Sequence, residues 1–116
     1  MKNRTSDEVR LKHILDAINK IENFIGNKGF DQFSSDELLQ SACIRQLEII
    51  GEAANHISED FFEEYNYIEW DEIVGLRNLL IHEYFGVDIQ IVWQVIKNDL
   101  PSLKNNINKI FNDLNI

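Results

Sequence analysis

The sequence predicts an all-α protein, a small up-and-down bundle of four to five helices. Apolar residues recur every three or four positions over long stretches, which is the pattern of one buried helix face. No segment alternates apolar and polar residues for long enough to indicate a strand. A length of 116 residues suits one domain, so we expect residues 1–116 to share a single core.

The first helix is predicted from about Asp7 to Ile25. Thr5 and Glu8 have the spacing of a capping box at its start, and Gly26 and Gly29 mark its end. One apolar stripe runs along it: Leu11, Ile14, Leu15, Ile18, Ile21 and Ile25.

A loop with two phenylalanines, Phe30 and Phe33, follows and is expected to fold back onto the core. Ser34 and Glu37 then offer a capping box for a second helix, from about Asp36 to Ser58. Its apolar stripe consists of Leu39, Cys43, Leu47, Ile50, Ala54 and Ile57.

The formal net charge is −9, from 11 Lys and Arg against 20 Asp and Glu. An acidic chain is an unusual partner for nucleic acid, because phosphate-binding domains are mostly basic. Seven of the acids, however, lie within Glu59–Glu72, which contains no Lys or Arg and is rich in aromatic residues. We expect this acidic segment to form a short helix or turn, and the rest of the chain is nearly neutral.

A third helix is predicted from near Asp71 to about Tyr84, where Gly86 stops it. Asp88 can cap a fourth helix, and Pro101 must either kink that helix or open a new one in its first turn. Apolar residues continue at helical spacing through Ile89, Val92, Trp93, Ile96, Leu103, Ile107, Ile110 and Leu114. We expect both tryptophans, Trp70 and Trp93, to act as packing anchors.

Cys43 is the only cysteine, so a disulfide framework is excluded, and its place on an apolar stripe predicts core packing. A single thiol and no secretory leader favour a cytoplasmic setting. No apolar run approaches the roughly 20 residues that a membrane span needs. No histidine pair, cysteine pair or phosphate loop suggests a metal or a cofactor.

Gly51 is unexpected, because a glycine inside a helix costs about 1 kcal/mol relative to alanine. Close approach of another helix explains it. The alternative is a functional role for the neighbouring Glu52, lining a cleft.

The segment Arg77–Tyr84 concentrates the polar side chains that suit catalysis. On a straight helix Arg77 and Tyr84 share one face, while Asn78 and His82 share another. The four side chains therefore meet only if the helix loosens before Gly86 or a second copy of the chain completes the site. The structural alternative is an ion pair of Arg77 with the acidic segment and a helix-capping role for His82.

The string Arg77-x-x-x-x-His82-x-Tyr84 resembles the signature of the HEPN superfamily, in its HepT-like branch. Other segments resemble that branch in the same order along the chain: Leu47–Ala54, Trp70–Asn78, Tyr84–Asp88, Trp93 and Asp99–Pro101.

The resemblance implies an α-helical, metal-independent endoribonuclease that cleaves tRNA or mRNA and needs no cofactor. Arg77 and His82 would be the catalytic residues, in a cleft shared by a homodimer, and Asn78 and Tyr84 would orient the RNA phosphate. The expected products are a 2′,3′-cyclic phosphate or 3′-phosphate and a 5′-hydroxyl.

The resemblance also implies a partner, a minimal nucleotidyltransferase of the MntA type that acts as antitoxin in a type VII-like HEPN/MNT pair. It would transfer AMP to Tyr84 and so neutralise the toxin. The acidic segment would then limit which RNAs enter the cleft or dock the antitoxin, with Glu63 and Glu64 as its test positions. The alternative is a non-catalytic helical binding subunit of a nucleotidyltransferase complex, which aromatic interface residues would suit.

Overall fold

The computed structural model describes residues 4–75 and 88–115, and every regular element within those ranges is helical. The helices are α1 (Arg4–Ile25), α2 (Phe30–Ser34), α3 (Glu37–Asn55), α4 (Glu59–Glu64), α6 (Ile89–Gln94), the π-helical turn η1 (Val95–Asp99) and α7 (Leu100–Asp113). Residues 70–75 are helical as well. The predicted all-α bundle is confirmed.

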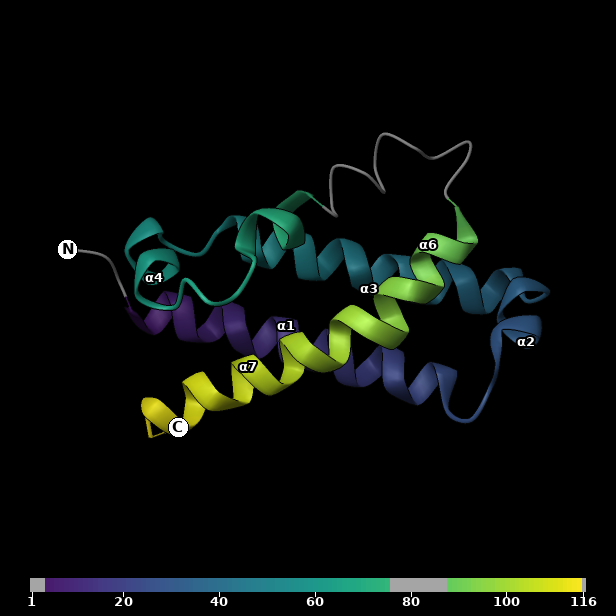
Figure 1. The fold of residues 1–116 in the computed structure, drawn as a ribbon, viewed down its shortest axis with the longest axis horizontal. Helices are drawn as coiled ribbons and strands as arrows, with labels where there is room; N and C mark the ends of the chain where they lie inside the picture. The colour runs from purple at the N-terminus through teal and green to yellow at the C-terminus, as the bar shows by residue number, and fades with distance from the viewer. Residues whose placement is uncertain (1–3, 76–87, 116) are drawn as a thin grey trace.

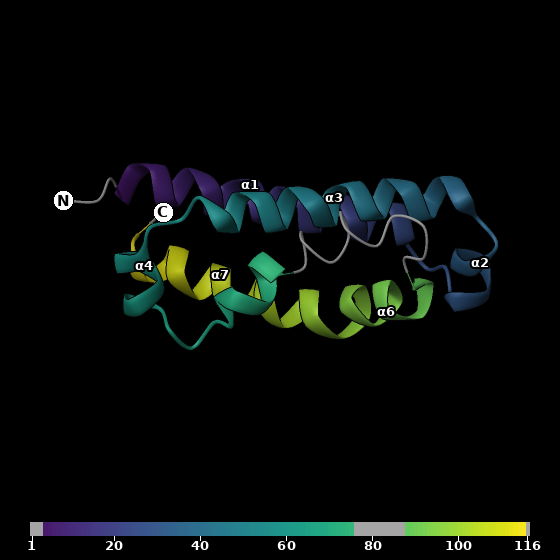
Figure 2. The same cartoon turned by 90° about the horizontal axis from the view of Figure 1, so that it is seen from above.

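The helices form two layers. The long helices α1 and α3 run antiparallel, side by side, in one layer, and α6, η1 and α7 cross them in the other (Figure 1, Figure 2). The short helices α2 and α4 lie at opposite ends of the molecule, which measures 47 × 29 × 19 Å. The start of α1 and the end of α7 lie at the same end.

The core lies between these layers and is built from the predicted stripes. Fully buried side chains come from α1, α2, α3, α4 and α7: Leu11, Ile14, Ile18, Ile21, Phe33, Cys43, Leu47, Ile50, Phe61, Ile107 and Ile110. Leu15, also predicted for the stripe of α1, is only half-buried, because it lies at the edge of that face. Burial of these apolar surfaces is the main favourable free-energy term of folding.

The start of α1 differs from the prediction. The helix already includes Thr5, so Thr5 is not its N-cap and that capping box is wrong. Asp7 is instead buried, with 4% of its surface exposed, and its two carboxylate oxygens accept hydrogen bonds from the backbone N–H (2.9 Å) and Oγ–H (2.8 Å) of Ser58. Ser58 is the N-cap of α4 and accepts from the Phe61 N–H, so Asp7 fixes the acidic segment to α1.

The region between α1 and α3 also differs. The predicted loop contains a short helix, α2, which buries Phe33 against the core as expected. The N-cap of α3 is Asp36, whose Oδ1 accepts from the Leu39 N–H at 3.0 Å. The capping box predicted for Ser34 and Glu37 is therefore wrong, although the helix begins where expected.

The second layer follows the prediction closely. The Asp88 side chain caps α6 by accepting from two backbone N–H groups, and Pro101 lies in the first turn of α7. Before it, the Leu100 N–H donates to the Val95 carbonyl, five residues earlier, so one π-turn joins α6 to α7. The predicted end of the third helix, at Tyr84 and Gly86, lies outside the described residues.

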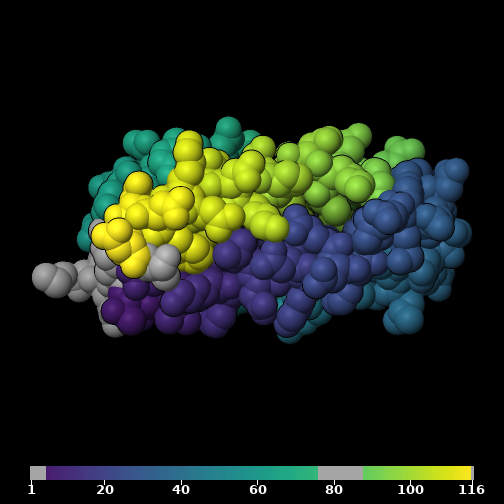
Figure 3. Space-filling model, turned by 90° about the horizontal axis from the view of Figure 1, so that it is seen from below, coloured from purple at the N-terminus to yellow at the C-terminus, as the bar shows by residue number. Residues whose placement is uncertain are grey.

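A charged contact ties α7 to α1. The two helices run along each other on the face drawn in Figure 3, and Lys104 Nζ donates to Glu22 Oε1 at 2.7 Å. Both side chains are partly exposed, so this pair adds little to stability compared with the apolar contacts beneath it. Among residues 4–75 and 88–115, no helix combines the length and apolarity of a membrane span.

Replacing Asp7 by alanine tests the contact with Ser58. Asp7→Ala leaves the partly buried Ser58 N–H and hydroxyl without their acceptor, so we expect the free energy of unfolding to fall by about 2 kcal/mol. Urea denaturation measures it. Asp16→Ala is the matched control, because Asp16 is an exposed acid of the same helix. Equal losses in the two variants would contradict the proposed role of Asp7.

Burial raises the pKa of the Cys43 thiol from 9.0 to about 11, so folding favours the protonated form. The resulting stability is complete below pH 9 and is lost as the pH rises to 11, because the unfolded chain ionises first. Relative to Cys43→Ala, we expect the wild type to lose about 2 kcal/mol over this range. Parallel denaturation curves of both proteins measure it, and an unchanged difference would contradict the shift.

Candidate active site

The residues predicted to carry the chemistry, Arg77, Asn78, His82 and Tyr84, lie in residues 76–87, outside the described residues. The structure describes the two segments that flank them, residues 70–75 before and α6 after. It also describes Glu52, the other predicted site residue, and the surface around it.

An aromatic cluster anchors the segment before the motif. Trp70 is buried, and its ring stacks on Phe62 with centroids 5.1 Å apart and meets Phe61 edge-on at 6.3 Å. Its Nε1–H donates to the Tyr65 carbonyl at 3.1 Å. The predicted anchoring role of Trp70 is confirmed, and the aromatic residues of the acidic segment supply the surface that holds it.

A second aromatic cluster anchors the segment after the motif. The Trp93 ring lies 5.1 Å from that of Phe33 and 5.9 Å from that of Phe30, between centroids, so α6 is fixed to α2. The ammonium group of Lys97 lies 5.1 Å from the centre of the same ring. Trp93 anchors α6 as predicted, although its ring is half-buried. The described segments on either side of the motif, residues 70–75 and α6, are therefore fixed to the bundle.

Glu52 lies on the solvent side of α3, while the adjacent Gly51 faces the core and is buried. Oε1 of Glu52 lies 3.3 Å from Nε2 of His56, one turn later in the chain, and His56 is the C-cap of α3. Glu52 also lines a surface hollow of about 320 Å³ between α1 and α3, with Arg10, His13, Arg45, Glu48, Ile49 and Ala53. The hollow brings both signs of charge together. That Glu52 lines a catalytic cleft stays a prediction.

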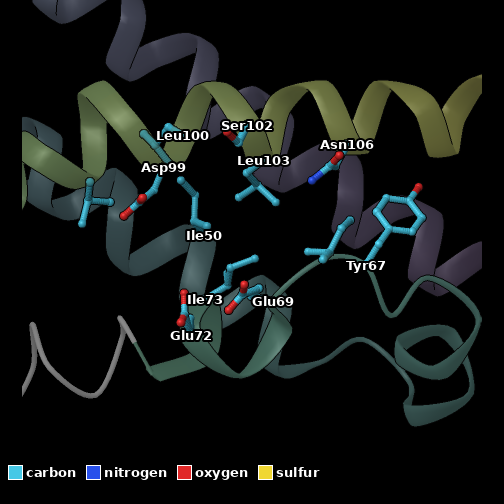
Figure 4. Close-up of a pocket in the computed structure, with 12 residues that line it drawn as sticks. Ile50, Tyr67, Glu69, Glu72, Ile73, Asp99, Leu100, Ser102, Leu103 and Asn106 are labelled. Carbon is cyan, nitrogen blue, oxygen red and sulfur yellow. The ribbon is translucent and has the colours of Figure 1, made fainter.

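A second cavity, of about 300 Å³, lies between residues 67–73 and the η1–α7 helix (Figure 4). Glu69 and Glu72 lie on one side of it and Asp99 on the other. A hydrogen bond to Glu69, followed by repulsion from the Glu69 charge, raises the pKa of Glu72. Sequence reasoning missed this cavity: the Glu69–Glu72 spacing was visible, but nothing in the sequence placed Asp99 opposite them.

Within residues 4–75 and 88–115, no group of three or more His, Cys, Asp and Glu side chains could hold a metal ion.

Comparison with known proteins identifies the family. The family model described as "Ribonuclease HepT-like" matches residues 14–110, most of the chain. The chain belongs to the HepT-like ribonuclease family. It is thus a ribonuclease by family, and the matched range contains every position of the predicted motif.

Curated relatives agree with this assignment. The chain is 44% identical over 100 residues to a protein of Thermococcus cleftensis named "Probable ribonuclease HepT", covering 86% of this chain and 91% of that one. It is 40% identical over 97 residues to a "Putative RNase" of Methanocaldococcus jannaschii, covering 84% and 89%.

A longer relative from the same archaeon is named "Gamma-glutamylcyclotransferase and putative RNase". The chain is 43% identical to it over 111 residues, which are 96% of this chain but only 50% of that protein. No solved structure matches the chain significantly.

Proposed function

We propose that this HepT-like ribonuclease is the toxin of a HEPN/MNT toxin–antitoxin pair, and that it cleaves tRNA or mRNA without a metal ion. The observation that carries the proposal is the intact string Arg77-x-x-x-x-His82-x-Tyr84 inside the range matched by the family. We further propose that Arg77 and His82 are its catalytic residues.

The residue types suit the reaction. RNA carries its own nucleophile, the 2′-hydroxyl, so the protein needs to assist proton transfer and to stabilise negative charge on the phosphate. Histidine titrates near neutral pH and suits the first task. The guanidinium of Arg77 is permanently charged and suits the second. Cleavage would leave a 2′,3′-cyclic phosphate or a 3′-phosphate and a 5′-hydroxyl.

The anchoring of the flanking segments supports this assignment. Catalytic groups need to be held in place by rigid surroundings, and Trp70 and Trp93 fix the chain on both sides of the motif. Asn78 and Tyr84 would orient the RNA phosphate, and Glu52 would line the same cleft. A homodimer would bring two motifs into one cleft, which fits the separation of Arg77 and His82 on a straight helix.

The regulation that we propose acts on Tyr84. A minimal nucleotidyltransferase would serve as antitoxin and transfer AMP from ATP to the tyrosine hydroxyl, with release of pyrophosphate. The added phosphate would place negative charge and bulk near Arg77, where the RNA phosphate should bind. The unmodified protein is then the active toxin.

Replacing His82 tests the catalytic assignment. We expect His82→Ala to lower the rate of RNA cleavage by at least about 100-fold, because loss of a general acid or base costs that much. The assay follows a labelled RNA in the presence of EDTA, and unchanged thermal unfolding shows that the variant folds. An RNA with 2′-deoxyribose at the cleaved positions is the chemical control and should stay intact.

Undiminished cleavage by His82→Ala would contradict the assignment. No cleavage by the unmodified wild type would instead favour the non-catalytic binding subunit. A stable complex with the nucleotidyltransferase fits both functions. Only the cleavage assay therefore separates them.

Tyr84 is tested by intact mass before and after incubation with the nucleotidyltransferase and ATP. We expect the wild type to gain the mass of one or more AMP units and to lose cleavage activity in parallel. Tyr84→Phe should gain no mass. Tyr67→Phe is the matched control, since Tyr67 is an exposed tyrosine outside the motif and should leave the modification unchanged. Modification of Tyr84→Phe to the same extent would place the acceptor elsewhere.

A further inference from the structure

The cavity of about 300 Å³ beside residues 67–73 has an apolar interior. Figure 4 shows it between two walls, the η1–α7 helix on one side and residues 67–73 on the other, with Ile50 of α3 between them. The apolar lining consists of Ile50, Ile68, Ile73, Val95, Leu100 and Leu103. A long aliphatic chain would therefore find contacts on three sides.

The rim of this cavity is acidic. Glu69 and Glu72, both exposed, come from one wall, and Asp99, also exposed, comes from the other. No Lys, Arg or His is among the described residues that line it. Glu69 and Asp99 both raise the pKa of Glu72, so the carboxylates act on one another across the rim. Their combined field favours a cation.

The π-turn helps to build this arrangement. The Leu100 N–H bonds to the Val95 carbonyl, so the helix widens by one residue directly before Pro101. Val95 and Asp99, which bound this turn, both line the cavity, as do Ser102 and Asn106 further along the same face. One helix therefore supplies an apolar wall and a carboxylate to the same opening.

We propose that this cavity binds an arginine or lysine side chain of a partner protein. The aliphatic stem would lie on the apolar lining, and the charged head would lie between Glu69, Glu72 and Asp99. Long basic side chains commonly bury their stems in this way while the charge stays at the surface. Charge-assisted hydrogen bonds to carboxylates are stronger than neutral ones.

The dimensions and the charge decide between the possible occupants. About 300 Å³ is at the small end of ligand pockets, so it admits one side chain and its neighbours rather than a folded element. An RNA strand would bring phosphates against three carboxylates, which disfavours it. Arginine is also among the residues that most often dominate protein interfaces. The proposal does not rest on the ribonuclease activity, and its test requires none.

The test uses two short peptides as probes. Ac-Leu-Arg-Leu-NH₂ carries the cation, and Ac-Leu-citrulline-Leu-NH₂ has nearly the same shape without the charge. Titrations of the ¹⁵N-labelled chain at moderate salt follow the backbone amide signals. We expect the arginine peptide to shift the signals of Glu69, Ile73, Asp99 and Ser102, and to bind at least about threefold tighter than the citrulline peptide.

A pair of double variants with equal charge changes separates the cavity from the acidic segment as a whole. Glu69→Gln with Glu72→Gln removes two of the three carboxylates of the rim and should weaken binding of the arginine peptide by about three- to tenfold. Asp60→Asn with Glu63→Gln removes two exposed acids of the same segment outside the cavity and should change binding less than twofold. All four positions are exposed, so both variants should fold.

Three results would overturn the proposal. Equal binding of the two peptides would remove the role of charge, and shifts confined to residues away from the cavity would remove its location. Stronger shifts of the cavity residues by a short single-stranded RNA, or on raising the concentration of the chain alone, would make RNA or a second copy the occupant instead.

Discussion

The apolar contact between α1 and α3 is the interaction on which the rest of the molecule depends. The two longest helices lie antiparallel along their buried stripes, α2 packs against α3, and α7 packs against α1. The free energy gained on packing grows with the apolar area that is buried. The short helices bury too little apolar area to be stable alone. The pair therefore provides the rigid layer on which the second layer is built.

The acidic segment combines charged side chains at the surface with aromatic side chains that pack against the protein. Phe61 and Phe62 pack against the buried Trp70, while the carboxylates of the segment face solvent. Asp7 of α1 fixes the segment at its start, through Ser58. Residues 70–75, which lead into the motif of this ribonuclease family, are thereby held at a defined place. Most of the net charge of −9 comes from this one segment.

Much of the fold could be predicted from the helical spacing of apolar residues along the sequence. The stripes of α1 and α3, the cap at Asp88 and the helix opening near Pro101 are local patterns, and local hydrogen bonding realises them directly. The errors are local too: Thr5 and Ser34 had capping-box spacing, but neither caps the helix assigned to it. Spacing alone cannot decide which of several nearby polar residues caps a helix, because the choice depends on the backbone path that leads into the helix.

The sequence by itself determined the helical class, the core stripes and, through its motif, the family to which this ribonuclease belongs. Only the tertiary structure decided that Asp7 is buried against Ser58, 51 residues away, and that Asp99 faces Glu69 and Glu72 across one cavity. Helical periodicity reports which face of an element is apolar. It carries no information about which polar groups on different elements meet, since that is set by the angle and offset at which whole helices pack.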